Sequence, residues 1–246
     1  MRLTRLYVPQ ALRAGTLVEL PKDTAAHLAK VLRARAGDEV SLFSGDGREL
    51  SGVIEAVRGQ RVSVQVGAVL AVDPESPLQI TLIQCVPRGE KMDLIVQKAT
   101  ELGVQRIVPA LSKRCVVRLD GAQAAAKQAH WQAVAVSACE QSGRTRLPLI
   151  DAPLPLLSFL GALTPGGLRL VLDPFAQGGP LLEAAGEVAF AVGPEGGFED
   201  TELQAFTLAG FRALKLGPRI LRTETAAIAG ITYLQAIMGD LSASSV

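Results

Sequence analysis

Short runs in which apolar and polar residues alternate fill residues 1–72 of the chain. A period of two is typical of β-strands with one buried face, and glycines at 45, 47 and 59 mark turns between the runs. We therefore expect a small, half-exposed β-barrel. The predicted strands span residues 17–20, 39–43, 50–57 and 61–66, and one helix is expected at 24–35, where Leu28, Val31 and Leu32 share a face.

The pattern changes after residues 73–77, a stretch with two prolines and two acidic residues that is typical of a linker. From residue 78 onwards apolar runs alternate with helical segments, which predicts an α/β fold with a mostly parallel sheet and helices on both faces. We therefore place two domains at 1–72 and 78–246. In the second we expect strands at 78–85, 107–111, 168–172, 188–192 and 213–216, and helices at 90–102, 122–141, 180–185, 200–209 and 223–238.

Two helix ends carry recognisable signals. Gly103 directly follows the predicted helix 90–102 and suits the C′ position, where a left-handed backbone favours glycine. Thr201, followed three residues later by Gln204, fits a capping box at the start of the helix 200–209. Both signals support the predicted boundaries.

Composition narrows the possible classes of protein. Apolar residues make up 48% of the 246 residues, but no run approaches the roughly 18 consecutive apolar residues of a membrane span. The first ten residues lack the apolar core of a signal peptide. Three widely spaced cysteines and two isolated histidines favour buried, reduced thiols and no metal site. We expect a cytoplasmic protein without a membrane segment.

The charge is uneven, although the whole chain carries a net charge of only +1. Residues 1–72 hold ten Lys and Arg against seven Asp and Glu, so the basic excess is N-terminal. Aromatic residues make up only 4% of the chain, which argues against a surface that binds single strands mainly by stacking.

Two glycine-containing loops are the strongest candidates for chemistry. Residues 193–198, GPEGGF, and 216–226, LGPRILRTETA, each follow an apolar run and precede a helix. Ligands of open α/β sheets bind at such ends of strands. The nucleotide signatures GxGxxG and GxxxxGK[ST] are missing, which disfavours a Rossmann dehydrogenase or a P-loop enzyme. Taken singly, the first loop also fits a tight turn, and Arg219, Arg222 and Glu224 also fit a solvated helix end.

In combination, the motifs resemble the RsmE-type 16S rRNA (uracil-N3)-methyltransferases of the SPOUT superfamily, nearly from end to end. The likeness rests on the shared order and spacing of short pieces that are weak alone. Arg88 departs from the pattern, because it stands where lysine is common, and it keeps the charge but not the donor geometry. The pieces are 27–33 (HLAKVLR), 44–47 (SGDG), 91–92, 98–103 (KATELG), Arg114, 140–144 (EQSGR) and the two glycine loops.

The resemblance implies an N-terminal PUA-like RNA-binding barrel and a C-terminal domain threaded into a trefoil knot. It also implies a homodimer, S-adenosylmethionine (SAM) as cofactor, and 16S rRNA of the small ribosomal subunit as partner. The implied cofactor residues are Leu172, Gly193, Glu195, Gly196, Gly197, Leu216, Gly217, Ile220, Leu221 and Ala226. The candidates for RNA contact are Arg2, Arg5, Lys30, Arg33, Lys91 and Arg114, with a solvated surface as the alternative for the barrel residues.

For the reaction, we expect Arg144 and Arg222 to hold phosphate or the negative charge that develops on the base. Glu224 or Glu195 is expected to accept the proton of uridine N3, with water as the alternative. Other functions stay open from sequence alone. They are ribose 2′-O methylation by a related enzyme, a non-catalytic RNA-binding or ribosome-assembly factor, and a small-molecule enzyme.

Overall fold

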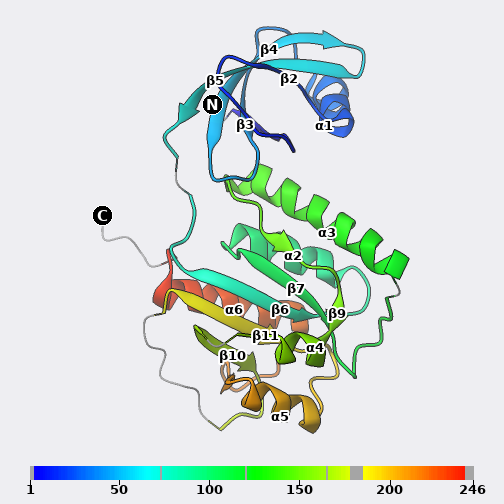
Figure 1. The fold of residues 1–246 in the computed structure, drawn as a ribbon, viewed down its shortest axis with the longest axis vertical. Coiled ribbons are helices and arrows are strands. Elements are labelled where there is room, and N and C mark those ends of the chain that lie inside the picture. The colour runs from blue at the N-terminus through cyan, green and yellow to red at the C-terminus, as the bar shows by residue number, and fades with distance from the viewer. Residues whose placement is uncertain (1–2, 73, 120, 165, 178–184, 242–246) are drawn as a thin grey trace. The chain divides into compact units, whose positions relative to one another are not determined.

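The computed structural model describes residues 3–72, 74–119, 121–164, 166–177 and 185–241 (Figure 1). Internal contacts divide the chain into two compact units. The first unit comprises residues 1–75 together with 139–147, and the second comprises 76–138 and 148–246. The segment 139–147 therefore packs with the first unit, although the residues on both sides of it in the chain belong to the second unit.

The first unit is built on a five-stranded sheet in the order β1-β3-β4-β5-β2. β1 runs parallel to β3, and the other neighbours are antiparallel. Sequence analysis missed β1, which is only four residues long. The strands are β1 (Thr4–Tyr7), β2 (Leu17–Glu19), β3 (Glu39–Phe43), β4 (Glu49–Arg58) and β5 (Arg61–Leu70).

The helix predicted at residues 24–35 begins and ends earlier in the chain than expected. It begins as α1 (Lys22–His27) and continues as a π-helical turn, η1 (Leu28–Leu32). Arg33 then adopts φ +51°, a left-handed conformation that ends the helix.

The alternation predicted for the strands is present, because one face of the sheet forms an apolar core. Leu6, Val40, Leu42 and Val64 on this face are buried. Their neighbours Arg5, Ser41 and Glu49 belong to the opposite face by the period of two.

The second unit contains seven parallel strands in the order β12-β10-β11-β6-β7-β8, with β9 also paired to β7. The predicted parallel sheet is confirmed. The strands are β6 (Gln79–Cys85), β7 (Arg106–Leu111), β8 (Leu149–Ile150), β9 (Leu154–Pro155), β10 (Leu168–Leu172), β11 (Glu187–Val192) and β12 (Arg212–Leu214). The helices are α2 (Lys91–Glu101), α3 (Gly121–Ser142), α4 (Leu156–Gly161), α5 (Asp200–Leu208) and α6 (Thr223–Met238).

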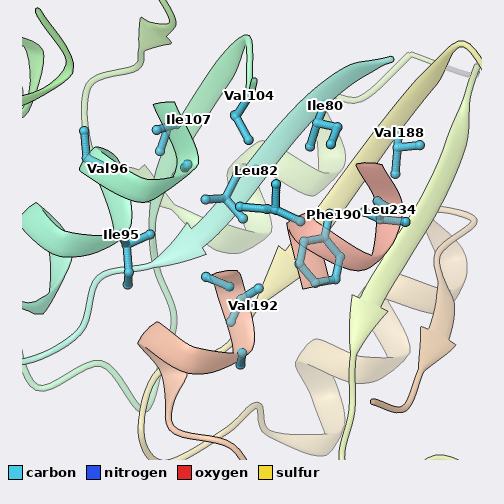
Figure 2. Close-up of a cluster of buried hydrophobic side chains, with 14 of the residues drawn as sticks. Ile80, Leu82, Ile95, Val96, Val104, Ile107, Val188, Phe190, Val192 and Leu234 are labelled. Atoms are coloured by element: carbon cyan, nitrogen blue, oxygen red, sulfur yellow. The ribbon is translucent and has the colours of Figure 1, made fainter. Parts of the chain in front are cut away.

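Apolar clusters cover both faces of this sheet. Leu82 and Phe190 join one cluster with residues of α2, α3 and α6, and Figure 2 shows Leu82, Phe190 and Leu234 within it. The adjacent Ile83 and Ala191 join a second cluster with residues of α4 and α5. Successive strand residues therefore contribute to opposite layers, as a sheet covered on both faces requires.

The helix-end predictions have mixed outcomes. Gly103 has φ +84° and its N–H bonds to Thr100 O, which confirms the C′ position. The capping box at α5 is built by Glu199 and Glu202, so its prediction at residues 201–204 was wrong. The helix expected at 180–185 falls almost wholly outside the described residues, and the knot stays a prediction.

Candidate functional site

A pocket of about 520 Å³ lies in the second unit, where β10 and β11 end and α6 begins. Three segments form its walls: residues 172–175, residues 192–198, and residues 220–223 with Ala226. Lys91 of α2, Arg114 and Leu203 complete the lining. The pocket therefore lies at the carboxyl ends of parallel strands, the usual place for a ligand in an α/β sheet.

The glycine loop 193–198 is closely packed. The N–H of Gly197 donates a 2.9 Å hydrogen bond to Pro194 O, and Gly197 has φ +67°, which favours glycine. A Cβ on Gly193 would lie 3.2 Å from the ring of Phe198. Phe198 in turn packs edge to face on Phe206 of α5. Packing and the tight turn together fix the backbone that faces the pocket.

A buried hydrogen-bond chain supports this loop from behind. The Thr223 hydroxyl donates to Gly193 O at 2.7 Å and accepts from Gln84 Nε2 at 3.0 Å. Gln84 is fully buried in β6, and its Nε2 also donates to Cys85 O at 2.9 Å. Sequence analysis did not select Gln84, although a glutamine inside the apolar run 78–85 was a visible signal.

A charged cluster stands beside the same loop. Lys91 Nζ donates a 2.9 Å hydrogen bond to Glu195 Oε1 and lies 3.6 Å from Glu224 Oε2. The hydrogen bond to Glu195 raises the pKa of Lys91. Burial opposes ionisation of Glu195, but hydrogen bonds from Lys91 and from the Arg88 N–H outweigh it and lower the pKa of that carboxyl. Glu195 is therefore a weakened base.

Glu224 differs from Glu195 in its surroundings. Its side chain is only 15% exposed, and Oε2 accepts no hydrogen bond from the described residues. Arg222, two residues earlier, precedes α6 at the N-cap, lines the pocket and is exposed. The start of α6 therefore places Arg222 in the pocket lining, whereas Glu224 is not among the lining residues and its Oε2 is buried.

Arg114 holds the glycine loop from another side. Its Nη1 donates a 2.9 Å hydrogen bond to Gly196 O, and a Cβ on Gly196 would lie 3.3 Å from Arg114 Cβ. Arg114 and Lys91, both expected as RNA contacts, thus line the pocket and bind the loop itself. Their contact with RNA stays a prediction.

The structure brings most of the expected cofactor residues together. Leu216 and Gly217 are not among the lining residues, and Leu216 packs against the apolar core of the unit. The expected residues that do line the pocket are Leu172, Gly193, Glu195, Gly196, Gly197, Ile220, Leu221 and Ala226.

Arg144 belongs to the first unit and is buried there. Its Nε and Nη2 donate to Glu75 Oε2 at 3.0 and 2.8 Å, while the N–H groups of Thr145 and Arg146 donate to Glu75 Oε1 at 2.9 Å. Burial opposes ionisation of Glu75, but these contacts outweigh it and lower the pKa of its carboxyl. Arg144 therefore fixes residues 75 and 144–146 to each other.

Arg5, expected as an RNA contact, is also buried in the first unit, and its contact with RNA stays a prediction. It is 8% exposed and bonds both oxygens of Glu49 at 3.0 Å. Its other N–H groups donate to the backbone carbonyls of Cys139, Glu140 and Arg144. Lys30 and Arg33 are exposed, and Arg2 lies outside the described residues.

Among the described residues, no group of three or more His, Cys, Asp or Glu could hold a metal ion. None of the helices described is long and apolar enough to cross a membrane. Cys85, Cys115 and Cys139 are buried free thiols.

Comparison with known proteins shows the family to which this chain belongs. Residues 74–235 match the model of an RNA methyltransferase domain, and residues 20–67 match that of an RNA methyltransferase PUA domain. A Ribosomal RNA small subunit methyltransferase E of Buchnera aphidicola is 33% identical over 98% of this chain and 99% of the relative. The enzyme of that name from Mycobacterium tuberculosis is 32% identical, covering 97% of this chain and 94% of its own.

Solved structures agree with these sequence relatives. A Ribosomal RNA small subunit methyltransferase E of Neisseria gonorrhoeae, bound to SAM, is 37% identical with a TM-score of 0.91. A Legionella pneumophila protein in complex with SAM is 40% identical with a TM-score of 0.90. In both cases the match covers 98% of this chain and 100% of the other.

Proposed function

Because the chain belongs to the ribosomal RNA small subunit methyltransferase E family, we propose that it transfers a methyl group from SAM to N3 of a uridine in 16S rRNA. The observation that carries the proposal is the pocket at the ends of β10 and β11. It combines the glycine loop 193–198 with the start of α6 in a fold that relatives share with SAM bound.

The residues of the pocket fit this cofactor. Leu172, Leu221 and Ala226 offer apolar walls, and Gly193 and Gly196 let the backbone approach a ligand closely. The backbone carbonyls of both glycines are already engaged, by Thr223 and by Arg114. The same cradle is therefore rigid before a ligand arrives, which lowers the entropy lost on binding.

When bound, SAM supplies an activated methyl group. The protein then has to hold the cofactor, orient the uridine and take the proton from N3. Uridine N3 is hidden inside a base pair, so the substrate is a single-stranded or flipped base.

We propose that Glu224, rather than Glu195, accepts the proton of uridine N3. Glu195 already accepts hydrogen bonds from Lys91 and Arg88, which lower its pKa and weaken it as a base. Glu224 Oε2 accepts no hydrogen bond from the described residues and stands 3.6 Å from Lys91 Nζ. Oε2 of Glu224 therefore keeps lone pairs that no donor among the described residues occupies.

We propose that Arg222 binds the negative charge that develops on the base, or an adjacent phosphate. It is exposed and lines the pocket, and a guanidinium can donate two parallel hydrogen bonds to a phosphate or to a developing negative charge. The contacts of Arg144 with Glu75 support a structural role for Arg144 instead, within the first unit.

We place part of the RNA backbone contact on Lys30, which is exposed in η1, and on Arg33, which is exposed directly after it. Removing both charges weakens RNA binding and reduces the slope of log affinity against log salt by up to about 2. Titration of rRNA at several salt concentrations tests this, and an unchanged slope removes the assignment.

We further propose a homodimer, as the family resemblance implies. Ile231 and Leu234 of α6 are buried in the unit and cannot serve a partner. Tyr233 and Ile237 on the same helix are 40% and 47% exposed and can do so. Sedimentation at micromolar concentration tests the dimer, and a monomer alone contradicts it.

The reaction is tested with methyl-labelled SAM and total rRNA from cells that lack the native modification. Label in the small-subunit RNA supports the proposal. Cofactor binding with no label in any RNA points to a different substrate, such as a small molecule. Failure to bind SAM favours a non-catalytic RNA-binding factor.

A further inference from the structure

One aromatic side chain of the pocket in the second unit stays in solvent. Phe175, in the segment that follows β10, is 78% exposed and lines the pocket of about 520 Å³. It belongs to none of the three apolar clusters of the described residues. The chain has seven phenylalanines, and the other six are buried or packed on another ring: Phe43, Phe159, Phe190, Phe198, Phe206 and Phe211.

Exposure alone does not make Phe175 a binding residue, because single apolar side chains on a surface are normal. Leu208 on α5 is such a residue, since it is 90% exposed and does not line the pocket. Phe175 differs by its position in the pocket lining. An exposed ring in a ligand pocket needs a different explanation from an exposed side chain elsewhere.

The backbone that carries Phe175 is held in place. The N–H of Asp173 donates a 3.0 Å hydrogen bond to Leu214 O at the end of β12. Asp173 Oδ1 in turn accepts a 2.9 Å hydrogen bond from the N–H of Phe175. Only the two side-chain torsions of Phe175 are left to order, so a contact with its ring costs little conformational entropy.

The exposure of the lining residues separates the floor of the pocket from its rim. Val192, Thr223 and Ala226 are buried and form the floor, beside the glycine loop that we propose holds SAM. Phe175 and Arg222 are exposed and stand at the rim. A base that receives the methyl group approaches a cofactor on this floor from the open side. It therefore passes the rim, where Phe175 lies.

The chemistry of the ring decides which part of the RNA it contacts. A phenyl ring has no charge and no hydrogen-bond donor, so it offers nothing specific to a phosphate. It offers a flat apolar face, and bases that leave their stack are held on aromatic side chains in this way. Aromatic residues make up only 4% of the chain. This is too few for a platform that binds many bases, but one ring is enough for one base.

We propose that Phe175 stacks on the target uracil in the pocket, an inference that rests on the proposed function. Stacking occupies the face of the base and leaves free the edge that carries N3. Because the lone pair of deprotonated N3 lies in the plane of the ring, fixing this plane directs N3 towards the methyl group. Arg222, at the same rim, can then bind the charge that develops on the base.

The first test measures methyl transfer from SAM to small ribosomal subunits that lack native modification. Phe175→Leu keeps an apolar side chain but removes the ring, and Phe175→Tyr keeps the ring. Leu208→Ala, outside the pocket, is the control. We expect kcat/KM for the subunits to fall about 10- to 100-fold in Phe175→Leu, the range that one stacked base accounts for. Phe175→Tyr and Leu208→Ala should stay close to the wild type. An unchanged kcat/KM in Phe175→Leu, or an equal loss in Phe175→Tyr, overturns the proposal.

The adenine ring of SAM is the other flat surface that could lie on Phe175. Isothermal calorimetry distinguishes the two, because stacking on uracil predicts the same SAM affinity in Phe175→Leu and the wild type. Weaker SAM binding in Phe175→Leu, with a normal rate at saturating SAM, would assign the ring to the cofactor and overturn the proposal. The melting temperature should not change, since the side chain is mostly in solvent.

A second measurement needs neither a variant nor methyl transfer. Small-subunit RNA that contains 5-iodouridine is bound to the wild-type chain and irradiated. Light breaks the carbon–iodine bond, and the base then forms a carbon–carbon bond to an aromatic ring in contact with it, with loss of hydrogen iodide. Mass spectrometry of the peptides locates the product. Coupling at Phe175 supports the proposal, whereas coupling only at other residues, or none, overturns it.

These outcomes are separable from those of the proposed function. If the wild-type chain methylates rRNA and Phe175→Leu does so with equal kcat/KM, the stacking role fails and the function stands. If iodouridine couples to Phe175 but no methyl group reaches any RNA, the chain binds a uracil at this ring and the proposed reaction fails.

Discussion

The hydroxyl of Thr223, the first residue of α6, donates a 2.7 Å hydrogen bond to the carbonyl of Gly193 at the end of β11. The two residues are 30 positions apart in the chain. The bond joins the two glycine loops into one pocket, and Gln84 secures it by donating to the same hydroxyl at 3.0 Å.

Thr223→Val keeps the shape of the side chain but removes both hydrogen bonds. Gln84 Nε2 then loses one of its two acceptors in a fully buried position. We expect SAM affinity to fall about tenfold, and Thr223→Ser to restore most of it. Isothermal calorimetry measures both. Equal SAM affinity in the valine and serine variants would show that the hydroxyl does not position the loop.

Glu224→Gln tests whether Glu224 accepts the proton of uridine N3. Glutamine has a similar size but cannot act as a base, so we expect kcat to fall about 100-fold with SAM affinity unchanged. Glu195→Gln is the matched control, because Glu195 bonds Lys91 and supports the cofactor loop. It should weaken SAM binding more than it lowers kcat. A Glu224→Gln enzyme with the wild-type rate and pH profile would remove Glu224 from the mechanism.

Gly230→Ala tests the packing of α6 on the sheet. A Cβ at position 230 would lie 2.2 Å from the Phe190 ring, so the helix or the ring must move. We expect the free energy of unfolding to drop by about 3 kcal/mol. Gly161 is a helix glycine with open space around it. We expect Gly161→Ala to leave the free energy of unfolding unchanged or to raise it by up to about 1 kcal/mol. Urea denaturation measures both, and a similar effect for the two substitutions contradicts the packing.

Glu75 predicts a pH dependence of stability. Its folded pKa lies below the ordinary value of 4.5, so its contribution is present above about pH 4.5 and is lost as pH falls through the folded pKa. Glu75→Gln leaves buried Arg144 without its charge partner and should cost about 3 kcal/mol at pH 7. The variant should also lose less stability than the wild type between pH 5 and 3. Parallel acid dependence in the two proteins would show that Glu75 does not account for it.

The fold of the second unit was largely predictable because most of its longer strands are apolar runs that alternate with helical segments. Phe190 and Ala191 are both buried, which is why β11 shows a continuous run rather than alternation. Elements with little sequence signal were missed. β8 and β9 have two residues each, and α4 has six.

The site was predictable where backbone conformation demands a particular residue. Gly197 at φ +67° is such a position. Arg5 and Arg144 show the limit, because a guanidinium looks the same in a sequence whether it faces RNA or a buried carboxylate. Only the fold brings Glu49 to Arg5, 44 positions apart, and Glu75 to Arg144, 69 positions apart.

The most direct test of the central claim is nucleoside mass spectrometry of 16S rRNA. Small ribosomal subunits that lack native modification are incubated with the purified chain and SAM, and the RNA is digested to nucleosides. We predict 3-methyluridine in the wild-type reaction and its loss in Glu224→Gln. A 2′-O-methylated nucleoside, or no methylated nucleoside despite SAM binding, would contradict the account.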